Sequence, residues 1–379
     1  MNRKKVVVIG AGQTGRGYLG RYLFENNYDF AFIDKNEELV RLMQEDKAFS
    51  IHFYKKDRTP LYVENFETYL SHSKEATKKI HEADLIFTCV FEENLKDVAL
   101  QLKEGLKGKD KTTEICTAEN GINPGKILKK YLNEYEVYAP YKIGMTAVFC
   151  STIKIASTRL DILSMNMDWF PYDADNLEPF GFKGEEKVHN FTQLLQRKIW
   201  TYNCLAGIIS YCGYIKGYEI YGDAANENEI KQLQLDILEE LNPALQDYFN
   251  ISKEDQEAFA QRAFEKMIDK SIYDLCMKTA RAAFRKLGPT ERIMSPMKIL
   301  LENNKDVKIL EFNAAAALVF WEEQQGNGTE PMLDKHPIDK FCEINNLSRN
   351  NAIVKNVEKY YNKIKENRND IKIYDILNN

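Results

Sequence analysis

Lys198 and Asn203 are polar residues within an otherwise apolar segment, Arg197–Gly207, that is expected to be helical. Burying such groups costs free energy unless they are paired or used. A partly buried lysine, whose pKa desolvation lowers, could take a proton from an alcohol near neutral pH, and an asparagine amide could donate a hydrogen bond to the resulting alkoxide. On helical spacing alone, the stronger alternative is that Lys198 extends to solvent and Asn203 bonds a neighbouring helix.

A glycine-rich turn near the start of the chain predicts a dinucleotide site. The β-branched run Val6–Ile9 enters Gly10-Ala-Gly-Gln-Thr-Gly-Arg-Gly17, in the context of a strand before and a helix after. In this fingerprint, the first glycine permits the tight turn, the second lets backbone approach the pyrophosphate, and the third lets the helix pack closely on the strand. The helix N-terminus offers N–H groups to the phosphates. Residues expected to contact the cofactor are Gly10, Gly12, Gln13, Thr14, Gly15, Arg16, Asp34, Val90 and Asn120.

Asp34 indicates which nicotinamide cofactor is used. It ends the apolar strand Phe30–Ile33, at the spacing where a carboxylate accepts hydrogen bonds from the adenosine ribose. The same carboxylate would repel the 2′-phosphate of NADP. Lys35 follows directly, which leaves some tolerance of NADP open. The predicted cofactor is NAD.

Strands and helices alternate through the first half of the chain. The patterns predict strands over Phe49–Tyr54, Asp84–Val90 and Glu114–Thr117, and helices over Glu37–Gln44, Leu95–Leu106 and Pro124–Leu132. Such alternation is typical of a parallel, doubly wound sheet. Ligands of these sheets bind beyond the carboxyl ends of strands, where Val90 and Asn120 fall. The segment Trp169–Gly184, rich in proline and glycine, is expected to be a connection.

Helical periodicity dominates the second half. Helices are predicted over Val188–Tyr214, Asn228–Leu241, Lys253–Met267, Ser271–Arg285 and Ala352–Asn367, with breaks at Asn242-Pro243, Gly288-Pro289 and Gly326-Asn327-Gly328. The small-residue segment Asn313–Phe320 is expected to form a helix that packs tightly against a neighbour. The predicted fold is therefore α/β: a Rossmann-type doubly wound sheet in residues 1–187, followed by a mainly α-helical domain in residues 188–379.

Composition narrows the function classes. With 379 residues and a net charge of −5, the chain has no global attraction for nucleic acid. No apolar run is long enough for a signal peptide or a membrane span, so we expect a cytoplasmic protein. The seven dispersed cysteines are expected to be reduced thiols. The five dispersed histidines match no zinc-binding pattern, so we do not expect a zinc site.

Several motifs spread along the chain carry a resemblance to a known family. They are Ile9–Gly17, Glu119-Asn120, Phe182-Lys183-Gly184, Arg197-Lys198-x4-Asn203 with Tyr211–Gly217, and Phe284-Arg285-Lys286-Leu287 with Arg292 and Pro296. Together they resemble the polyol-specific long-chain dehydrogenases, the mannitol dehydrogenase family. The resemblance implies hydride transfer between a nicotinamide and a polyol or sugar phosphate without metal. It also implies that Lys198 is the general acid/base and that Asn120 and Asn203 hold the reacting oxygen.

The chain departs from the family pattern in two places. The family motif continues Lys-x4-Asn-x2-His, whereas here the histidine position is Ala206, whose methyl cannot hydrogen-bond a substrate hydroxyl. Where the family has an Asp-Arg pair, this chain reads Cys150-Ser-Thr-Ile-Lys154. Lys154 would suit a phosphate or carboxylate of the substrate, or it is a solvated lysine at a strand end.

Basic residues at and beyond the end of the predicted helix Ser271–Arg285 suggest an anionic substrate. Arg285, Lys286 and Arg292 could bind a phosphate or carboxylate, and the alternative is a solvated helix face. The fingerprint predicts an NAD-dependent oxidoreductase, a monomer or small homo-oligomer. The resemblance implies that it interconverts a polyol and its keto sugar, with a polyol phosphate such as mannitol 1-phosphate favoured. One alternative is a tagaturonate- or fructuronate-like uronate reductase of the same family. The other is a regulatory protein that still binds NAD but has lost catalysis, an alternative that Ala206 suggests.

Overall fold

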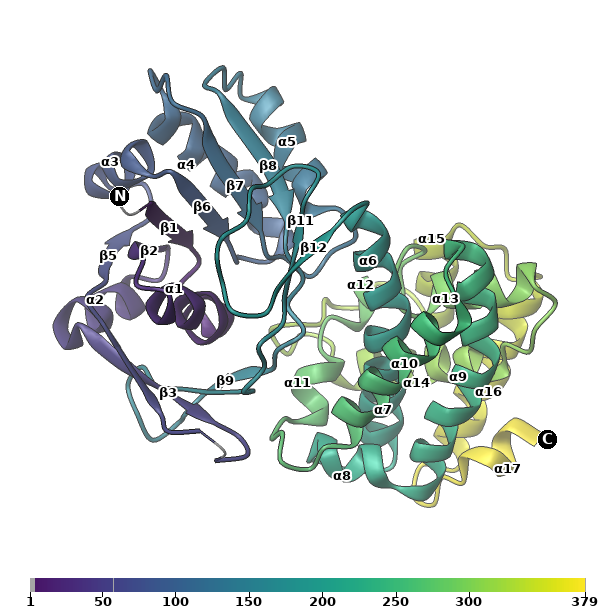
Figure 1. Cartoon of the computed structure of the whole chain (residues 1–379). Helices are drawn as coiled ribbons and strands as arrows, with labels where there is room; N and C mark the ends of the chain where they lie inside the picture. The colour runs from purple at the N-terminus through teal and green to yellow at the C-terminus, as the bar shows by residue number, and fades with distance from the viewer. Residues whose placement is uncertain (1–3, 57, 379) are drawn as a thin grey trace. The chain divides into compact units, whose positions relative to one another are not determined.

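The computed structural model describes residues 4–56 and 58–378, and the chain divides into two compact units between Leu195 and Gln196 (Figure 1). The first unit combines parallel strands with helices, and the second is helical. The predicted fold class is confirmed. The predicted boundary after residue 187 falls within β12 (Glu185–Val188), and the division between the compact units falls within α6 (Phe191–Lys198).

A parallel sheet organises the first unit. Its strands lie in the order β5-β2-β1-β6-β7-β8, which is the doubly wound arrangement. Alternate residues of β1 pack in two separate cores: Val6 and Val8 lie in one, and Val7 and Ile9 in the other. Burial of both faces explains the continuous apolar runs of these strands. The bounds are β1 (Lys5–Ile9), β2 (Asp29–Asp34), β5 (Glu67–Leu70), β6 (Leu85–Thr88), β7 (Thr113–Thr117) and β8 (Tyr141–Met145).

Helices connect these strands, as the alternating pattern predicts. They are the π-helix η1 (Gly15–Gly20), α1 (Arg21–Glu25), α2 (Glu37–Asp46), α3 (Lys74–Glu82), the short 3-10 turn η2 (Glu92–Asn94), α4 (Leu95–Leu106) and α5 (Pro124–Glu134). Side chains cap several of them; Asn36, for example, accepts a hydrogen bond from the Leu39 N–H at the start of α2. In Figure 1, α3, α4 and α5 lie alongside the strands β6, β7 and β8.

Two small sheets complete the first unit. One has the order β4-β3-β10-β9, with bounds β3 (Ala48–Phe53), β4 (Leu61–Glu64), β9 (Thr152–Lys154) and β10 (Ile162–Ser164). The other pairs β11 (Phe170–Asp173) with β12 in parallel. The expectation of a plain connection over Trp169–Gly184 is therefore wrong at β11. Phe170 and Tyr172 explain the difference, since both rings are buried in the aromatic core.

The second unit is built from helices around the buried helix α14 (Lys308–Gln324), which packs against α7 (Cys204–Ile215) and α16 (Ala352–Glu366). Ala314 to Ala317 are fully buried, so the expected tight packing of this small-residue segment is confirmed. The remaining helices are the π-helix η3 (Ile199–Asn203), α7 (Cys204–Ile215), α8 (Tyr221–Asn226), α9 (Asn228–Phe249), α10 (Lys253–Ile268), α11 (Cys276–Ala280), α12 (Ala283–Lys286), α13 (Met294–Glu302), α15 (Pro337–Asn345), α16 (Ala352–Glu366) and α17 (Ile373–Asn378).

The predicted break at Asn242-Pro243 is wrong, because α9 continues through Pro243. Pro243 and Glu239, four residues earlier, are both exposed, so the carbonyl that loses its hydrogen bond can face water. The buried Leu241 and Leu245 hold the helix in place on either side. Here tertiary packing outweighs the local cost of proline.

The single helix predicted over Ser271–Arg285 is also wrong, since only α11 and α12 are helical there. Ala282 separates them with a left-handed φ of 59°. The Glu330 carboxylate accepts a hydrogen bond from the Ala283 N–H at 2.9 Å and thereby satisfies the start of α12. Throughout the described ranges, no helix is long and apolar enough to cross a membrane.

Candidate active site

The glycine-rich turn between β1 and η1 has the geometry that the fingerprint predicts. Gly10 adopts a φ of 105°, and a Cβ there would lie 2.2 Å from the Cys89 carbonyl oxygen. A Cβ on Gly15 would lie 1.9 Å from the Gly10 carbonyl oxygen, so only glycine allows this close approach of helix and turn. A Cβ on Gly12 would meet no atom within 4 Å. The backbone at Gly12 therefore faces open space, which suits the approach of a pyrophosphate.

Asp34, at the end of β2, is held against this turn. Its Oδ2 accepts a hydrogen bond from the Ala11 N–H at 2.7 Å, and its Oδ1 accepts one from the Asn36 N–H at 2.9 Å. Each carboxylate oxygen keeps further acceptor capacity for a ribose hydroxyl. The neighbouring Lys35 donates to Asn94 Oδ1 at 2.8 Å. Lys35, the residue that could tolerate the 2′-phosphate of NADP, thus bonds the segment that follows β6.

The other residues predicted to contact the cofactor have different surroundings. Gln13 is exposed and Thr14 is half-buried at the start of the helix. The Arg16 guanidinium is buried, donates to the Ala11 carbonyl oxygen and lies 5.9 Å from the centre of the Phe49 ring. Burial lowers the pKa of Arg16 to about 10, although the charge of Asp34 opposes the shift. Arg16 thus supports the turn from its buried side.

The carboxyl ends of β6 and β7 are tied together by Glu119, which is buried. Both of its carboxylate oxygens accept from the Val90 N–H at 3.1 Å, and burial raises the pKa of the carboxyl. Asn120 follows as an exposed residue, and Phe91 is exposed with a φ of 68°. Val90 and Asn120 therefore lie at the edge that the sequence predicts. The sequence does not predict that Glu119 joins these two strand ends, because its position in the sequence does not show that it is buried.

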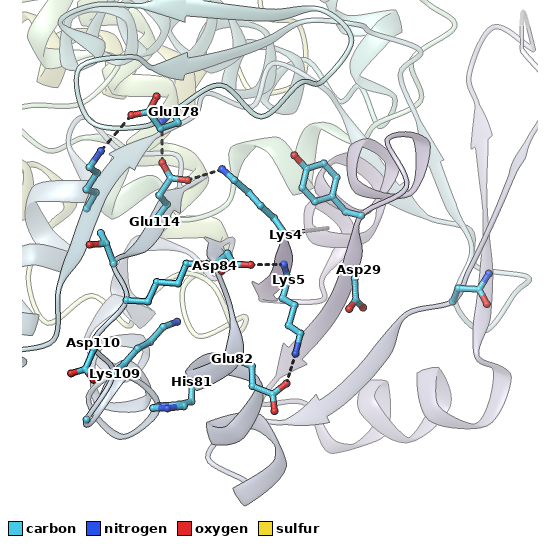
Figure 2. A pocket seen from close by; sticks show the side chains of 16 residues that line it. Lys4, Lys5, Asp29, His81, Glu82, Asp84, Lys109, Asp110, Glu114 and Glu178 are labelled. Atoms are coloured by element: carbon cyan, nitrogen blue, oxygen red, sulfur yellow. Dashed lines mark hydrogen bonds and ion pairs between the residues drawn. The ribbon is translucent and has the colours of Figure 1, made fainter. Parts of the chain in front are cut away.

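A wide hollow of about 1330 Å³ lies at the opposite edge of the sheet (Figure 2). Several of its lining charges form ion pairs with one another. Lys4 bonds Glu114 at 3.0 Å, and Lys5 bonds Glu82 at 3.0 Å. Because this hollow lies at the amino ends of β1 and β7, it is not where a doubly wound sheet binds its cofactor.

In the second unit, a π-helical turn shapes the segment that carries Lys198 and Asn203. Residues five apart are displaced by about 140° around an α-helix. The π-helix η3 covers Ile199–Asn203, between α6 and α7, and its i→i+5 hydrogen bonding widens that turn. The wider turn brings Lys198 and Asn203 closer to one face. Ala206 and Gly207 follow Asn203 by three and four residues in α7 and extend that face.

Lys198 is a candidate for acid/base chemistry because it is buried and carries a shifted pKa. Its side chain is buried at 6% exposure. Burial lowers the pKa of the Lys198 amine to about 7, with further contributions from the positive charges of Lys266 and Arg292. An amine with this pKa can both take and give a proton near neutral pH. The sequence did not point to Lys266, because a lysine on the amphipathic helix α10 usually faces solvent.

Two of the four basic residues predicted to bind an anion, Arg292 and Lys286, lie near one another, and Arg292 also acts on Lys198. Arg292 is buried at 5% exposure, and its Nε lies 3.4 Å from Glu291. Lys286 donates to the Thr279 carbonyl oxygen at 2.5 Å, and burial together with Arg292 lowers the pKa of Lys286 well below its usual value. Arg285 is more exposed and pairs with Glu291. Arg292 thus acts on both Lys198 and Lys286, and its charge makes the surroundings of these two amines a cationic region.

Lys154 belongs to the first unit and lies exposed at the end of β9, the strand whose Thr152 lies beside Gly17 of η1. Its backbone register pairs it with Ile162 of β10. As for metals, no group of three or more His, Cys, Asp or Glu that could hold an ion occurs within residues 4–56 and 58–378.

Comparisons with known proteins agree with this description. The family model of the mannitol dehydrogenase Rossmann domain matches residues 4–153, and that of the mannitol dehydrogenase C-terminal domain matches residues 188–373. The chain is 26% identical to a mannitol-1-phosphate 5-dehydrogenase of Thermoanaerobacter pseudethanolicus, covering 96% of this chain and 98% of that one. It is 28% identical to the enzyme of the same name from Bacillus subtilis, covering 82% and 86%.

Solved structures share the fold. The mannitol 2-dehydrogenase of Pseudomonas fluorescens, in a ternary complex with NAD and D-mannitol, superposes with a TM-score of 0.77 at 12% identity, covering 99% of this chain and 94% of that one. A D-sorbitol dehydrogenase superposes with a TM-score of 0.66 at 13% identity, covering 97% and 93%. With matches to both family models across the two halves, this chain belongs to the mannitol dehydrogenase family.

Proposed function

We propose that this protein is an NAD-dependent dehydrogenase that interconverts a polyol phosphate, such as mannitol 1-phosphate, and its keto sugar phosphate. The observation that carries the proposal is the buried amine of Lys198, with a pKa of about 7, beside Arg292. Family membership and the names of the relatives support the same reaction class. We assign cofactor binding to residues 1–187 and substrate binding to residues 188–379.

The residues of the glycine-rich turn fit NAD. Open space at Gly12, the close approach of Gly15 to Gly10 and the carboxylate of Asp34 are the features that a diphosphate and an adenosine ribose require. Bound NAD supplies the hydride acceptor for oxidation of the carbinol carbon. The chain contributes binding and orientation, and the position of Asp34 disfavours a 2′-phosphate.

Lys198 is the proposed proton acceptor in the oxidation direction. Its neutral Nζ takes the proton of the reacting hydroxyl as the carbinol carbon becomes a carbonyl carbon, and the ammonium form returns a proton in the reverse direction. The Asn203 amide is the proposed hydrogen-bond donor to the developing alkoxide. Asn120 lies at the carboxyl edge of the sheet in the first unit. On the basis of the resemblance, we also propose it as a contact to the reacting oxygen.

A negatively charged substrate group suits the cationic region. Lys198 must be largely neutral to act as a base, so the lasting positive charge comes from Arg292, assisted by Lys266. Arginine binds phosphate through a planar fork of donors. We propose Arg292 and Lys286 as phosphate contacts and retain Arg285 and Lys154 as further candidates that the sequence suggests.

The test is a substrate panel with the purified protein. Mannitol 1-phosphate, sorbitol 6-phosphate, free mannitol, free arabinitol, and the uronates tagaturonate and fructuronate are each assayed by the absorbance of reduced nicotinamide. We expect the phosphate esters to give a much higher kcat/KM than the free polyols. Efficient turnover of free polyols alone would refute the phosphate assignment. Binding of NAD without turnover of any panel member would instead favour a regulatory protein.

A further inference from the structure

Asn313 is a polar residue at the centre of the apolar helix α14. It is fully buried, between Phe312 and Ala314. Neither its Oδ1 nor its Nδ2 hydrogen-bonds any partner among the described residues. Two other amides of the helical unit are partly satisfied. The buried Gln234 donates from Nε2 to the Ala225 carbonyl oxygen at 3.0 Å, and the half-buried Asn345 donates from Nδ2 to the Leu287 carbonyl oxygen at 3.0 Å, so only their side-chain oxygens lack a partner among the described residues. A wholly unpaired amide in such a place costs stability and calls for an explanation.

The position of Asn313 supplies that explanation. Its Nδ2 lies 3.4 Å from the point that a Cβ on Gly207 would occupy. The Cδ and Cγ atoms of Arg292 lie 3.7 and 3.8 Å from the same point. Gly207 follows Asn203 by one helical turn, and Arg292 is one of the charges that act on Lys198. The unpaired amide therefore lies against the face of α7 that carries the proposed chemistry, where Gly207 has no side chain to cover it.

We propose that Asn313 is a substrate-binding residue whose carboxamide hydrogen-bonds a hydroxyl of the polyol chain beside Lys198. This inference rests on the proposed function. A carboxamide offers a donor and an acceptor, so it can satisfy a hydroxyl in either sense. Ala206, directly before Gly207, presents a methyl that can do neither. Asn313 thus provides, from the facing helix, the polar contact that α7 itself lacks at this position.

The experiment compares Asn313→Leu with Gln234→Leu, a matched removal of a buried amide in the same unit. For Asn313→Leu we expect kcat/KM for mannitol 1-phosphate to fall on the order of tenfold or more, chiefly through KM, since a uniform binding contact is lost. Its Tm should equal or exceed that of the wild type, because an apolar group replaces an unpaired one. Gln234→Leu, which loses hydrogen bonds made within the fold, should have a lower Tm and an unchanged kcat/KM.

A series of monodeoxy derivatives of mannitol 1-phosphate identifies the hydroxyl. The wild type should discriminate strongly against one derivative, because its Asn313 amide would remain unpaired, and Asn313→Leu should lose that discrimination alone. A wild type that turns over no panel substrate would contradict the proposed function, and the Tm comparison would still test Asn313. A lower Tm for Asn313→Leu would overturn the inference, as would an unchanged kcat/KM with unchanged discrimination on a substrate that the wild type accepts.

Discussion

The Asp34 carboxylate accepts a hydrogen bond from the Ala11 N–H at 2.7 Å and so joins the end of β2 to the glycine-rich turn after β1. This contact has two consequences. It fixes the turn in the conformation that leaves Gly12 open, and it places a negative charge where the adenosine ribose of a dinucleotide would lie. Cofactor affinity and cofactor selectivity therefore depend on one side chain, and substitutions can separate the two effects.

We predict that Asp34→Ser weakens NAD binding and relaxes discrimination against NADP. The substitution removes the charge that repels a 2′-phosphate, and it also weakens the hold on the Ala11 N–H. Asp34→Asn is the control, because its amide oxygen can still accept from Ala11 while the charge is gone. Titration of both cofactors into the wild type and both variants provides the measurement. A wild type that binds NADP in preference to NAD would reverse the prediction.

We predict that Lys198→Ala lowers turnover by roughly two to four orders of magnitude, the usual contribution of a positioned acid or base. NAD affinity should stay nearly intact, because the fingerprint belongs to the other compact unit. Asn203→Ala should raise the activation free energy by about 3 kcal/mol, the contribution of one donor to a developing oxyanion. Steady-state kinetics with a demonstrated substrate, combined with NAD titration, decide the matter. Near-normal turnover in Lys198→Ala would place the base elsewhere.

Local patterns predicted much of the first unit. The helix predicted over Leu95–Leu106 has the same bounds as α4, because its apolar positions repeat at helical spacing and one face packs on the sheet. The turn at Gly10 was equally predictable, since only glycine tolerates its geometry. The failure at Pro243 has the opposite cause: contacts with other helices outweigh what the local sequence prefers.

The surroundings of the proposed base could not be predicted in the same way. Lys198, Lys266 and Arg292 come from different parts of the chain, and which helix faces meet is decided by packing. The π-turn η3 has no recognised signature in its residues, although it changes which side chains share a face with Lys198. The sequence pattern around Asn313 predicts only a helix that packs tightly against a neighbour. Its unpaired amide is evident only once Gly207 and Arg292 are placed beside it.

We predict that the oxidation rate rises with pH through about 7, because the neutral amine of Lys198 is the active form. The reverse reduction, which needs the ammonium form, should slow over the same range.

The free energy of unfolding should also depend on the protonation of Lys198. Between about 7 and 10.5 the unfolded chain binds more protons at Lys198 than the folded chain does, so stability rises with pH there. Lys198→Met removes this contribution, and its stability advantage over the wild type should shrink as pH rises across that window. A constant difference in chemical denaturation would contradict the assignment.

We predict that Arg292→Gln moves the midpoint of the oxidation pH profile to higher pH. Burial is the main cause of the lowered pKa of Lys198, and the charges of Lys266 and Arg292 add to it, so loss of one cation must raise that pKa. The same variant should raise KM for a phosphate ester more than KM for the free polyol, since a phosphate contact is lost.

Lys278→Gln is the control for Arg292→Gln. It removes a cation of the same unit that pairs with Asp274 at 3.1 Å and is not among the charges that act on Lys198. Its profile should match that of the wild type. If both variants shifted the midpoint equally, the effect would reflect net charge, and the specific coupling of Arg292 to Lys198 would be refuted.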